Sequence, residues 1–249
     1  MPEILNIVIP MAGRGSRFAD AGYKMPKPLI AIHGRPMVEW VVENLRPDRA
    51  HRFVFLCLLE HLQSFDVRDR LQRIAPGCEI VTVDEVTEGA ACTVLLARKL
   101  IDSDAPLMIA NSDQWVDTSI DMYLKTTDGP DVEGFIMTMW ADHPKWSYLR
   151  LGPHGGVIEV VEKEVVSLEA TVGIYNFASG AAFVRAADRM IAGDLRVNGE
   201  FYVAPAYNQL LDEGHKINYC NVGQVEREVH GLGTPEDLLT FIKSPASLR

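Results

Sequence analysis

The segment at residues 7–29, IVIPMAGRGSRFADAGYKMPKPL, joins an apolar run to a glycine-rich loop that carries two arginines and a Pro-Lys-Pro. The apolar run predicts a buried strand, and glycines directly after it let the backbone approach a ligand closely. Backbone N–H groups and guanidinium groups both bind phosphate oxygens well. This segment therefore predicts a binding site for a polyphosphate, in the form of a nucleoside triphosphate.

Two common phosphate-loop patterns do not fit this loop. The dinucleotide-binding pattern G-x-G-x-x-G needs a third glycine where Phe18 stands, and the P-loop pattern needs Gly-Lys followed by Ser or Thr. The chain instead has Gly13, Gly15 and Arg17, followed after a short gap by Pro26-Lys27-Pro28. This argues against a dehydrogenase and against a P-loop NTPase.

At these residues the chain resembles the sugar-phosphate nucleotidyltransferase family, the pyrophosphorylases that make nucleotide-sugars. Further segments resemble the family in order and approximate spacing from Ile7 to Phe241. They are TEGAACT at 87–93, Asn111-Ser112-Asp113, Glu162-Lys163, Gly173-Ile174-Tyr175, Gly199-Glu200-Phe201-Tyr202 and Gly233-Thr234-Pro235-Glu236-Asp237. The resemblance implies an α/β fold, a three-layer α/β/α sandwich with a mainly parallel central sheet, similar to the GT-A and Rossmann-like nucleotidyltransferases.

The resemblance also implies a role for each position. Arg17 is expected to hold the β- and γ-phosphates, Lys27 the α-phosphate, and Lys163 the acceptor phosphate for in-line attack, which makes these three the expected catalytic residues. The expected nucleotide-binding residues are Met11, Ala12, Gly13, Arg14, Gly15, Ser16, Lys27, Glu88, Gly89 and Ser112. The expected acceptor-binding residues are Gly173, Tyr175 and Glu200.

Asp113 is the expected metal ligand, and Mg²⁺ is the expected cofactor. Many relatives have a second metal-binding aspartate at the position where this chain has Gly231. Glu226, Glu228 or Asp117 could take its place. Alternatively, Asp113 could hold the ion together with substrate phosphates and water.

Each assignment has a structural alternative. The glycine-rich loop could be a tight turn with solvated arginines, and Asp113 could cap the segment that follows it. Lys163 lies in a charged run, residues 159–164, that could form a solvated strand face. The joint occurrence of the loop, the Pro-Lys-Pro and Asp113 favours the functional interpretation.

The predicted reaction couples an NTP to a phosphorylated small molecule with release of pyrophosphate. CTP, UTP and dTTP are not distinguished, and a sugar 1-phosphate is the leading acceptor. Lys163 is followed by Glu164 where relatives commonly have proline, so a cytidylyltransferase acting on phosphocholine, a phosphonate or another non-sugar phosphate is the nearest alternative. A GT-A glycosyltransferase, for which Ser112-Asp113-Gln114 is a partial D-x-D match, and an inactive binding subunit are further alternatives.

Alternating apolar runs and amphipathic stretches predict βαβ units in the first half. Strands are expected at 6–11, 53–58, 79–83, 106–110 and 135–139, with helices at 36–45, 61–74 and 90–101. Short strands at 148–151, 157–161 and 171–177 predict a hairpin-rich acceptor-binding region at about 140–180. Helices at 180–192, 203–212 and 235–242 are expected to pack back on the sheet, and residues 1–249 are expected to form a single nucleotidyltransferase domain.

Composition limits the partners. The 249 residues carry a formal charge of −10, which argues against nucleic acid as a partner. No apolar stretch is long enough to span a bilayer, and the N-terminal MPEILNIVIP has acid where a secretion signal needs base, so we expect a cytoplasmic protein without membrane contact. The four cysteines are far apart, as expected for core residues in a reducing compartment. Self-association remains open, since relatives often form oligomers.

Overall fold

The computed structural model describes residues 4–127 and 132–248. Within them, nine strands form one sheet in the order β10-β9-β11-β6-β1-β4-β5, and β8 and β12 extend it beside β11. The strands are β1 (Leu5–Met11), β4 (His51–Leu58), β5 (Glu79–Val83), β6 (Leu107–Ala110), β8 (Val132–Trp140), β9 (Ser147–Leu151), β10 (Val157–Glu162), β11 (Glu169–Phe177) and β12 (Lys216–Gln224). The strands from β6 to β5 are parallel, and β11 runs antiparallel to β6.

Two short two-stranded sheets accompany the main one. One joins β2 (Ala31–Ile32) to β3 (Arg35–Pro36), and the other joins β7 (Gln114–Val116) to β13 (Val229–Gly231). The helices are α1 (Ser16–Asp20), α2 (Met37–Leu45), α3 (Leu59–Ser64), α4 (Val67–Ile74), α5 (Ala90–Leu95), α6 (Arg98–Ile101), α7 (Ile120–Thr127), α8 (Gly180–Ala192), α9 (Ala206–Asp212) and α10 (Pro235–Lys243). Short 3₁₀ turns occupy Lys27–Leu29 and Pro245–Leu248.

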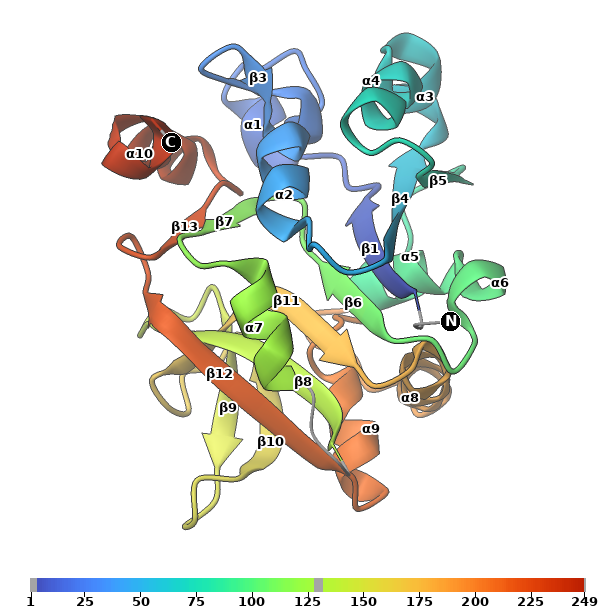
Figure 1. The fold of residues 1–249 in the computed structure, drawn as a ribbon, viewed down its shortest axis with the longest axis vertical. Coiled ribbons are helices and arrows are strands. Elements are labelled where there is room, and N and C mark those ends of the chain that lie inside the picture. Colours follow the sequence, from blue (N-terminus) through green and yellow to red (C-terminus); the bar gives the residue numbers. More distant parts are fainter. Residues whose placement is uncertain (1–3, 128–131, 249) are drawn as a thin grey trace.

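The alternation of side chains along β1 produces the layers. Ile7 and Ile9 face one apolar core, which also contains residues of α2, α4 and α7, whereas Val8 faces a second core that contains residues of α5, α6, α8 and α9. Helices therefore cover both faces of the sheet, as Figure 1 shows for α2 and α7 in front of it and α9 behind it. This confirms the expected three-layer sandwich.

A third apolar cluster lies outside the two sheet faces. It brings together Phe18 of α1, Trp40 of α2, Trp115 of β7 and Phe241 of α10. The expectation that α10 packs on the sheet is therefore wrong, because its buried side chains Leu238 and Phe241 join this cluster instead. In Figure 1, α10 lies next to β13 and away from the main sheet. The C-terminal helix is thereby packed near the glycine-rich loop.

Two helices expected as single elements are each divided. The segment at 61–74 is interrupted at Phe65, whose backbone is extended, so that α3 ends and α4 begins after Asp66. The segment at 90–101 turns at Ala97, and α6 then brings the carbonyl oxygen of Ile101 against Gly180. A Cβ on Gly180 would lie 1.7 Å from that oxygen, so the close approach of α6 and α8 requires glycine there.

The sequence analysis missed β12, which pairs in parallel with β8. Its sequence KINYCNVGQ contains two asparagines and a glycine, which are unfavourable in strands, and most of its residues are only partly buried. It also missed α1, α7, β2, β3, β7 and β13. The helix expected at 203–212 begins at Ala206, because Pro205 stands at its N-cap.

Candidate functional site

The site lies where the carboxyl ends of β1 and β6 meet. The two strands pair in parallel, so the loops that follow them, 12–15 and 111–113, come together at one edge of the sheet. Ligands of open α/β sheets bind at this edge because loops diverge there and leave a crevice.

The loop after β1 has the backbone that its glycines predict. Gly15 has a φ of +62°, and a Cβ at Gly15 would lie 3.2 Å from the Cβ of Lys27. Gly13 faces open space, with no atom within 4 Å of a Cβ built there. The loop therefore passes close to Lys27 and leaves room for a ligand beside Gly13.

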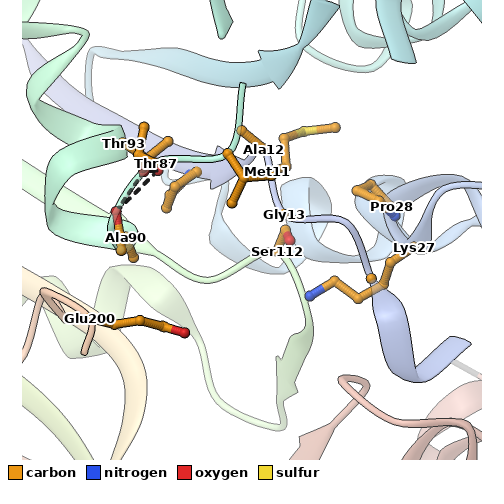
Figure 2. A pocket seen from close by; sticks show the side chains of 14 residues that line it. Met11, Ala12, Gly13, Lys27, Pro28, Thr87, Ala90, Thr93, Ser112 and Glu200 are labelled. Atoms are coloured by element: carbon orange, nitrogen blue, oxygen red, sulfur yellow. Dashed lines mark hydrogen bonds between the residues drawn. The ribbon is translucent and has the colours of Figure 1, made fainter. Parts of the chain in front are cut away.

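A cavity of about 290 Å³, here called the glycine-loop cavity, opens beside this loop. Figure 2 shows it between the end of β1, the turn at 87–93 and Lys27, with Glu200 on the opposite side. Seven of the nucleotide-binding residues expected from the sequence line it, and they are Met11, Ala12, Gly13, Gly15, Lys27, Gly89 and Ser112. Pro10, Pro28, Val86, Thr87, Ala90, Thr93 and Glu200 complete the lining.

The turn at 87–93 is held against the segment around Phe201. Gly89 has a φ of +135°, and a Cβ there would lie 2.4 Å from the carbonyl oxygen of Phe201. The Phe201 N–H donates to the carbonyl of Glu88 (2.8 Å), and the hydroxyls of Thr87 and Thr93 lie 2.6 Å apart. Only glycine fits at position 89, so this wall of the cavity is fixed by backbone packing.

Lys27 lines the glycine-loop cavity and forms an ion pair with Asp113. The Nζ of Lys27 donates to Oδ2 of Asp113 at 2.9 Å, and the two side chains are 23% and 25% exposed. The pair is therefore accessible to a ligand. In Figure 2 the Lys27 amine reaches into the space near Ser112.

A second cavity of about 430 Å³, here called the β11 cavity, adjoins the first, and Ala90 and Glu200 line both. It contains the remaining expected residues with catalytic, acceptor-binding or metal-binding roles, which are Arg17, Asp113, Lys163, Gly173, Tyr175 and Glu200. Its other lining residues are Ala90, Asn111, Gln114, Lys145, Trp146, Ser147, Glu162, Thr171, Val172, Tyr202, Val203, Ala204, Gly231, Gly233, Thr234 and Asp237. Most of the nucleotide-binding residues and all of the acceptor-binding residues expected from the sequence thus line two adjoining cavities.

Lys163 enters the β11 cavity from a strained backbone position. Its φ is +59°, in the left-handed region that non-glycine residues adopt infrequently. Its Nζ hydrogen-bonds the hydroxyl of Tyr202 and lies 4.4 Å from the centre of that ring. Burial raises the pKa of Tyr202, whereas the Lys163 ammonium opposes the shift.

Polar side chains also line this cavity. The Ser147 hydroxyl donates to the Glu162 carboxylate, and burial raises the pKa of Glu162, with the neighbouring Glu200 adding to the shift. The hydroxyl of Tyr175 lies 3.0 Å from that of Thr171, and burial raises the pKa of Tyr175 as well. A hydroxyl-rich ligand would find both donors and acceptors here.

Three expected nucleotide-binding residues lie elsewhere. The Glu88 side chain is 67% exposed and forms an ion pair with Arg196. Arg14 lines a separate open cavity that also includes Lys24 and His61. Ser16 begins α1 and lines neither of the two cavities as described for residues 4–127 and 132–248. The structure therefore does not bring these side chains to the glycine-loop cavity.

Lys145 lines the β11 cavity beside Trp146, although the sequence analysis assigned Lys145 no role there. The Nζ of Lys145 lies 3.0 Å from Oδ1 of Asp237 and 4.9 Å from the centre of the Trp146 ring. Lys145 and Asp237 are 92 positions apart, so no local pattern could predict their contact.

Gly231 lies in β13 and pairs with Gln114 of β7. Gln114 is the residue that directly follows Asp113. Of the carboxylates considered as replacements, Glu228 turns back on its own loop, where Oε2 accepts from the N–H of Gln224 (2.8 Å). Within the described part of the chain, neither Glu228, Asp117 nor Glu226 lines the β11 cavity. Residues 4–127 and 132–248 contain no group of three or more His, Cys, Asp or Glu side chains that could hold a metal ion.

Comparison with known proteins gives one consistent family. The family model described as nucleotidyl transferase matches residues 7–201. The chain is 23% identical over 217 residues to the bifunctional protein GlmU of Methanococcus maripaludis, covering 84% of this chain and 48% of that protein. It is 27% identical over 181 residues to the mannose-1-phosphate guanylyltransferase catalytic subunit beta of Danio rerio, covering 70% and 50%. The chain thus spans about half the length of the curated relatives it matches.

Solved structures agree with the fold. The nucleoside-diphosphate-sugar pyrophosphorylase from Vibrio cholerae RC9 superposes with a TM-score of 0.79 at 25% identity, over 96% of this chain and 100% of that one. A UDP-glucose pyrophosphorylase complexed with UDP-glucose gives a TM-score of 0.78 at 15% identity, over 99% and 100%, which supports the fold alone. Within the described residues, no helix is long and apolar enough to cross a membrane. The match includes the glycine loop, Lys27 and Asp113. Because the family model covers most of the chain, this protein belongs to the nucleotidyl transferase family.

Proposed function

We propose that this protein transfers a nucleotidyl group from an NTP to a sugar 1-phosphate, forming a nucleotide-sugar and pyrophosphate. The observation that supports this most strongly is the pair of connected cavities, which share Ala90 and Glu200. Cations border both spaces, with Lys27 in the first and Arg17 and Lys163 in the second. A triphosphate and a phosphorylated acceptor could therefore bind next to each other.

In the proposed reaction, an oxygen of the acceptor phosphate attacks the α-phosphorus of the NTP. A new P–O bond forms, the bond between the α-phosphorus and the α,β-bridging oxygen breaks, and pyrophosphate leaves with the electron pair. Lys27 would neutralise charge on the α-phosphate, Arg17 would bind the departing pyrophosphate, and Lys163 would orient the acceptor. No general base is needed, because the attacking phosphate oxygen is already ionised at neutral pH.

The Asp113 carboxylate suits Mg²⁺, which prefers hard oxygen ligands. It is accessible in the β11 cavity, and in this structure an ammonium group pairs with it. Asp113 would hold the ion, which when bound would supply further neutralisation of phosphate charge. Lys27 then exchanges its contact with Asp113 for a contact with the phosphates.

The lining of the β11 cavity favours a sugar over a quaternary ammonium group as the acceptor's non-phosphate part. Cation recognition would use the faces of Trp146 and Tyr202, but lysine ammonium groups already lie over both rings, at 4.9 Å and 4.4 Å. The Ser147 hydroxyl and the Glu162 carboxylate remain as hydrogen-bonding groups for sugar hydroxyls.

A pyrophosphate-release screen tests the proposal. CTP, UTP, dTTP, GTP and ATP are each combined with a panel of sugar 1-phosphates, phosphocholine and phosphonates in the presence of Mg²⁺. We expect pyrophosphate only when an NTP and a sugar 1-phosphate are both present. If an NTP releases pyrophosphate with phosphocholine or a phosphonate but with no sugar 1-phosphate, the acceptor is not a sugar. If no combination in the panel releases pyrophosphate, the proposed function is overturned.

Lys27→Ala provides the residue-level test. Loss of a charge-stabilising group at a transferring phosphate is expected to lower kcat about 10²–10³-fold. Lys24→Ala is the matched control, since Lys24 is exposed and borders a different cavity, and it should keep wild-type turnover. Equal turnover of Lys27→Ala and wild type would show that Lys27 has no catalytic role.

A further inference from the structure

Gly231 lines the β11 cavity next to the Asp237 carboxylate. A Cβ at Gly231 would lie 3.6 Å from Oδ2 of Asp237 and 3.4 Å from the Trp146 ring. Asp237 comes from the first turn of α10, and its backbone N–H donates to the Oγ1 of Thr234 at 3.1 Å. The helix cap therefore fixes the backbone from which this carboxylate reaches Gly231.

Asp113 borders the same stretch of backbone. A Cβ at Gly233 would lie 2.7 Å from Oδ2 of Asp113, and the N–H of Leu232 donates to the Asp113 carbonyl oxygen at 2.7 Å. A side chain at position 231 would thus meet Asp237, and one at position 233 would meet Asp113. Both carboxylates line the β11 cavity.

The two carboxylates have similar electrostatic surroundings. Each is paired with one lysine, Asp113 with Lys27 at 2.9 Å and Asp237 with Lys145 at 3.0 Å. Their side chains are 25% and 21% exposed, so both remain accessible from the cavity. In Asp237 the lysine contacts Oδ1, and Oδ2 is the oxygen nearest Gly231.

A buried oxygen without a partner lies in the same cavity wall. Gln114 follows Asp113 directly, pairs in register with Gly231 and is only 4% exposed. Its Nε2 donates to the carbonyl of Asn111 at 2.8 Å, whereas its Oε1 accepts no hydrogen bond within residues 4–127 and 132–248. Leaving such an oxygen unsatisfied costs free energy, which a ligand offering positive charge or a donor in this cavity would recover.

We propose that Asp237 supplies the second protein carboxylate for the divalent cation held by Asp113, and that Lys145 is the counterion of Asp237 when the cation is absent. The proposal rests on the proposed function, which brings Mg²⁺ and an NTP to Asp113. Mg²⁺ commonly binds one or two protein carboxylates and completes its coordination with substrate phosphates and water. The carboxylate that Gly231 cannot provide would thus come from α10.

The test measures Mn²⁺ binding by electron paramagnetic resonance, with the full-length protein and the NTP that binds best, in the absence of acceptor so that no turnover occurs. Asp237→Asn is expected to weaken Mn²⁺ binding by about tenfold or more, the scale seen when a metal site loses a supporting group. Glu236→Gln is the matched control, because it removes an exposed carboxylate from the same helical turn and should leave Mn²⁺ affinity unchanged.

Lys145→Gln separates a metal role for Asp237 from a purely structural one. If Asp237 only anchors Lys145, both substitutions break the same ion pair and should change Mn²⁺ affinity in the same direction. If Asp237 binds the cation, Lys145→Gln removes its competitor and should tighten Mn²⁺ binding by roughly twofold to fivefold, the worth of a partly exposed ion pair. Opposite effects of the two variants support the proposal, and equal effects overturn it.

Gly231→Asp in the Asp237→Asn background provides a rescue. Position 231 has ordinary backbone geometry, and an added Cβ would make contacts no closer than 3.4 Å. We expect the double variant to recover most of the lost Mn²⁺ affinity. If Asp237→Asn binds Mn²⁺ as tightly as the wild-type protein, this inference is overturned and the proposed function stands. If the wild-type protein binds no Mn²⁺ with any NTP, the inference is overturned together with the proposed role of Asp113.

Discussion

Lys27 and Asp113 are separated by 86 positions and form an ion pair at the carboxyl edge of the sheet. The sequence predicted Lys27 as a phosphate-binding residue and Asp113 as a metal ligand. The structure adds that the two side chains contact each other. The Lys27 ammonium limits the cost of leaving the Asp113 carboxylate without a compensating charge. In the proposed reaction, substrate binding breaks this contact, and the new contacts of Lys27 with phosphate offset the loss.

At the residue scale, Glu162 gives a pH prediction. Burial raises the pKa of Glu162 in the folded state. At pH values between the unfolded-state pKa and the folded-state pKa, the folded protein therefore binds more protons than the unfolded chain. The stability of the fold falls as pH rises through that window. Glu162→Gln removes this penalty and can still accept from Ser147. We expect the variant to melt higher than wild type at pH 7, by about 2–4 °C for each kcal/mol relieved, and the difference to vanish near pH 4.

Thermal unfolding followed between pH 4 and pH 8 measures the effect of Glu162→Gln. The control is Glu164→Gln, two positions further on, which changes an exposed carboxylate and should show no such pH-dependent gain. A Glu162→Gln variant that melts lower than wild type at pH 7 would mean that the ionised carboxylate stabilises the fold.

At the element scale, β11 connects the parallel strands β6, β1, β4 and β5 to the remaining strands β8, β9, β10 and β12 of the sheet. It pairs with β6, β8 and β9, and its register shifts between Thr171 and Tyr175. Gly173, with a φ of +89°, lies within this shift, against the Asn111 side chain. The irregularity places Gly173 and Tyr175 on the wall of the β11 cavity. A sequence pattern indicates a strand here, but it gives no information on how many partners the strand has.

The cap of α10 gives a prediction at this scale. Thr234→Ala removes the hydroxyl that accepts from the Asp237 N–H, so we expect a loss of about 1 kcal/mol of stability and weaker Mn²⁺ binding, because Asp237 loses its fixed backbone. Ser179→Ala in α8 removes a cap of the same 3.1 Å length away from both cavities. The matched control should lose similar stability and keep wild-type Mn²⁺ affinity.

Chemical denaturation and Mn²⁺ titration of both cap variants provide the measurements. Thr234→Ser is expected to restore both properties, since it retains the hydroxyl. Equal Mn²⁺ affinities for Thr234→Ala and Ser179→Ala would show that the α10 cap does not position Asp237.

At the scale of the whole molecule, three apolar clusters support the site. Two lie on the faces of the sheet, and the third joins α1, α2, β7 and α10 through Phe18, Trp40, Trp115 and Phe241. The third cluster is small and links the start of the chain to its end. Because α1, which follows the glycine-rich loop, and α10 both pack in this cluster, we expect a nucleotide bound at the loop to stabilise this part of the protein.

Nucleotide binding should therefore raise the midpoint of thermal unfolding. At a hundredfold excess over Kd, a ligand specific for the folded state contributes about 2.7 kcal/mol. We expect one or more of CTP, UTP and dTTP to raise the midpoint in wild type and to lose most of this effect in Lys27→Ala. The measurement is thermal unfolding with each NTP over a range of concentrations. A shift of equal size in Lys27→Ala would show that the nucleotide binds without using the glycine-loop cavity as described.

The sequence by itself determined the glycine-rich loop, the strands of the parallel half and the order of the family motifs. These features depend on short-range sterics and on apolar periodicity, which neighbouring residues carry. Only the tertiary structure decided that α10 packs beside α1, that Glu88 turns away to Arg196, and that Lys145, Asp237 and Gly231 lie together. These contacts join residues far apart in the chain, and their geometry depends on how helices and strands pack rather than on any local pattern.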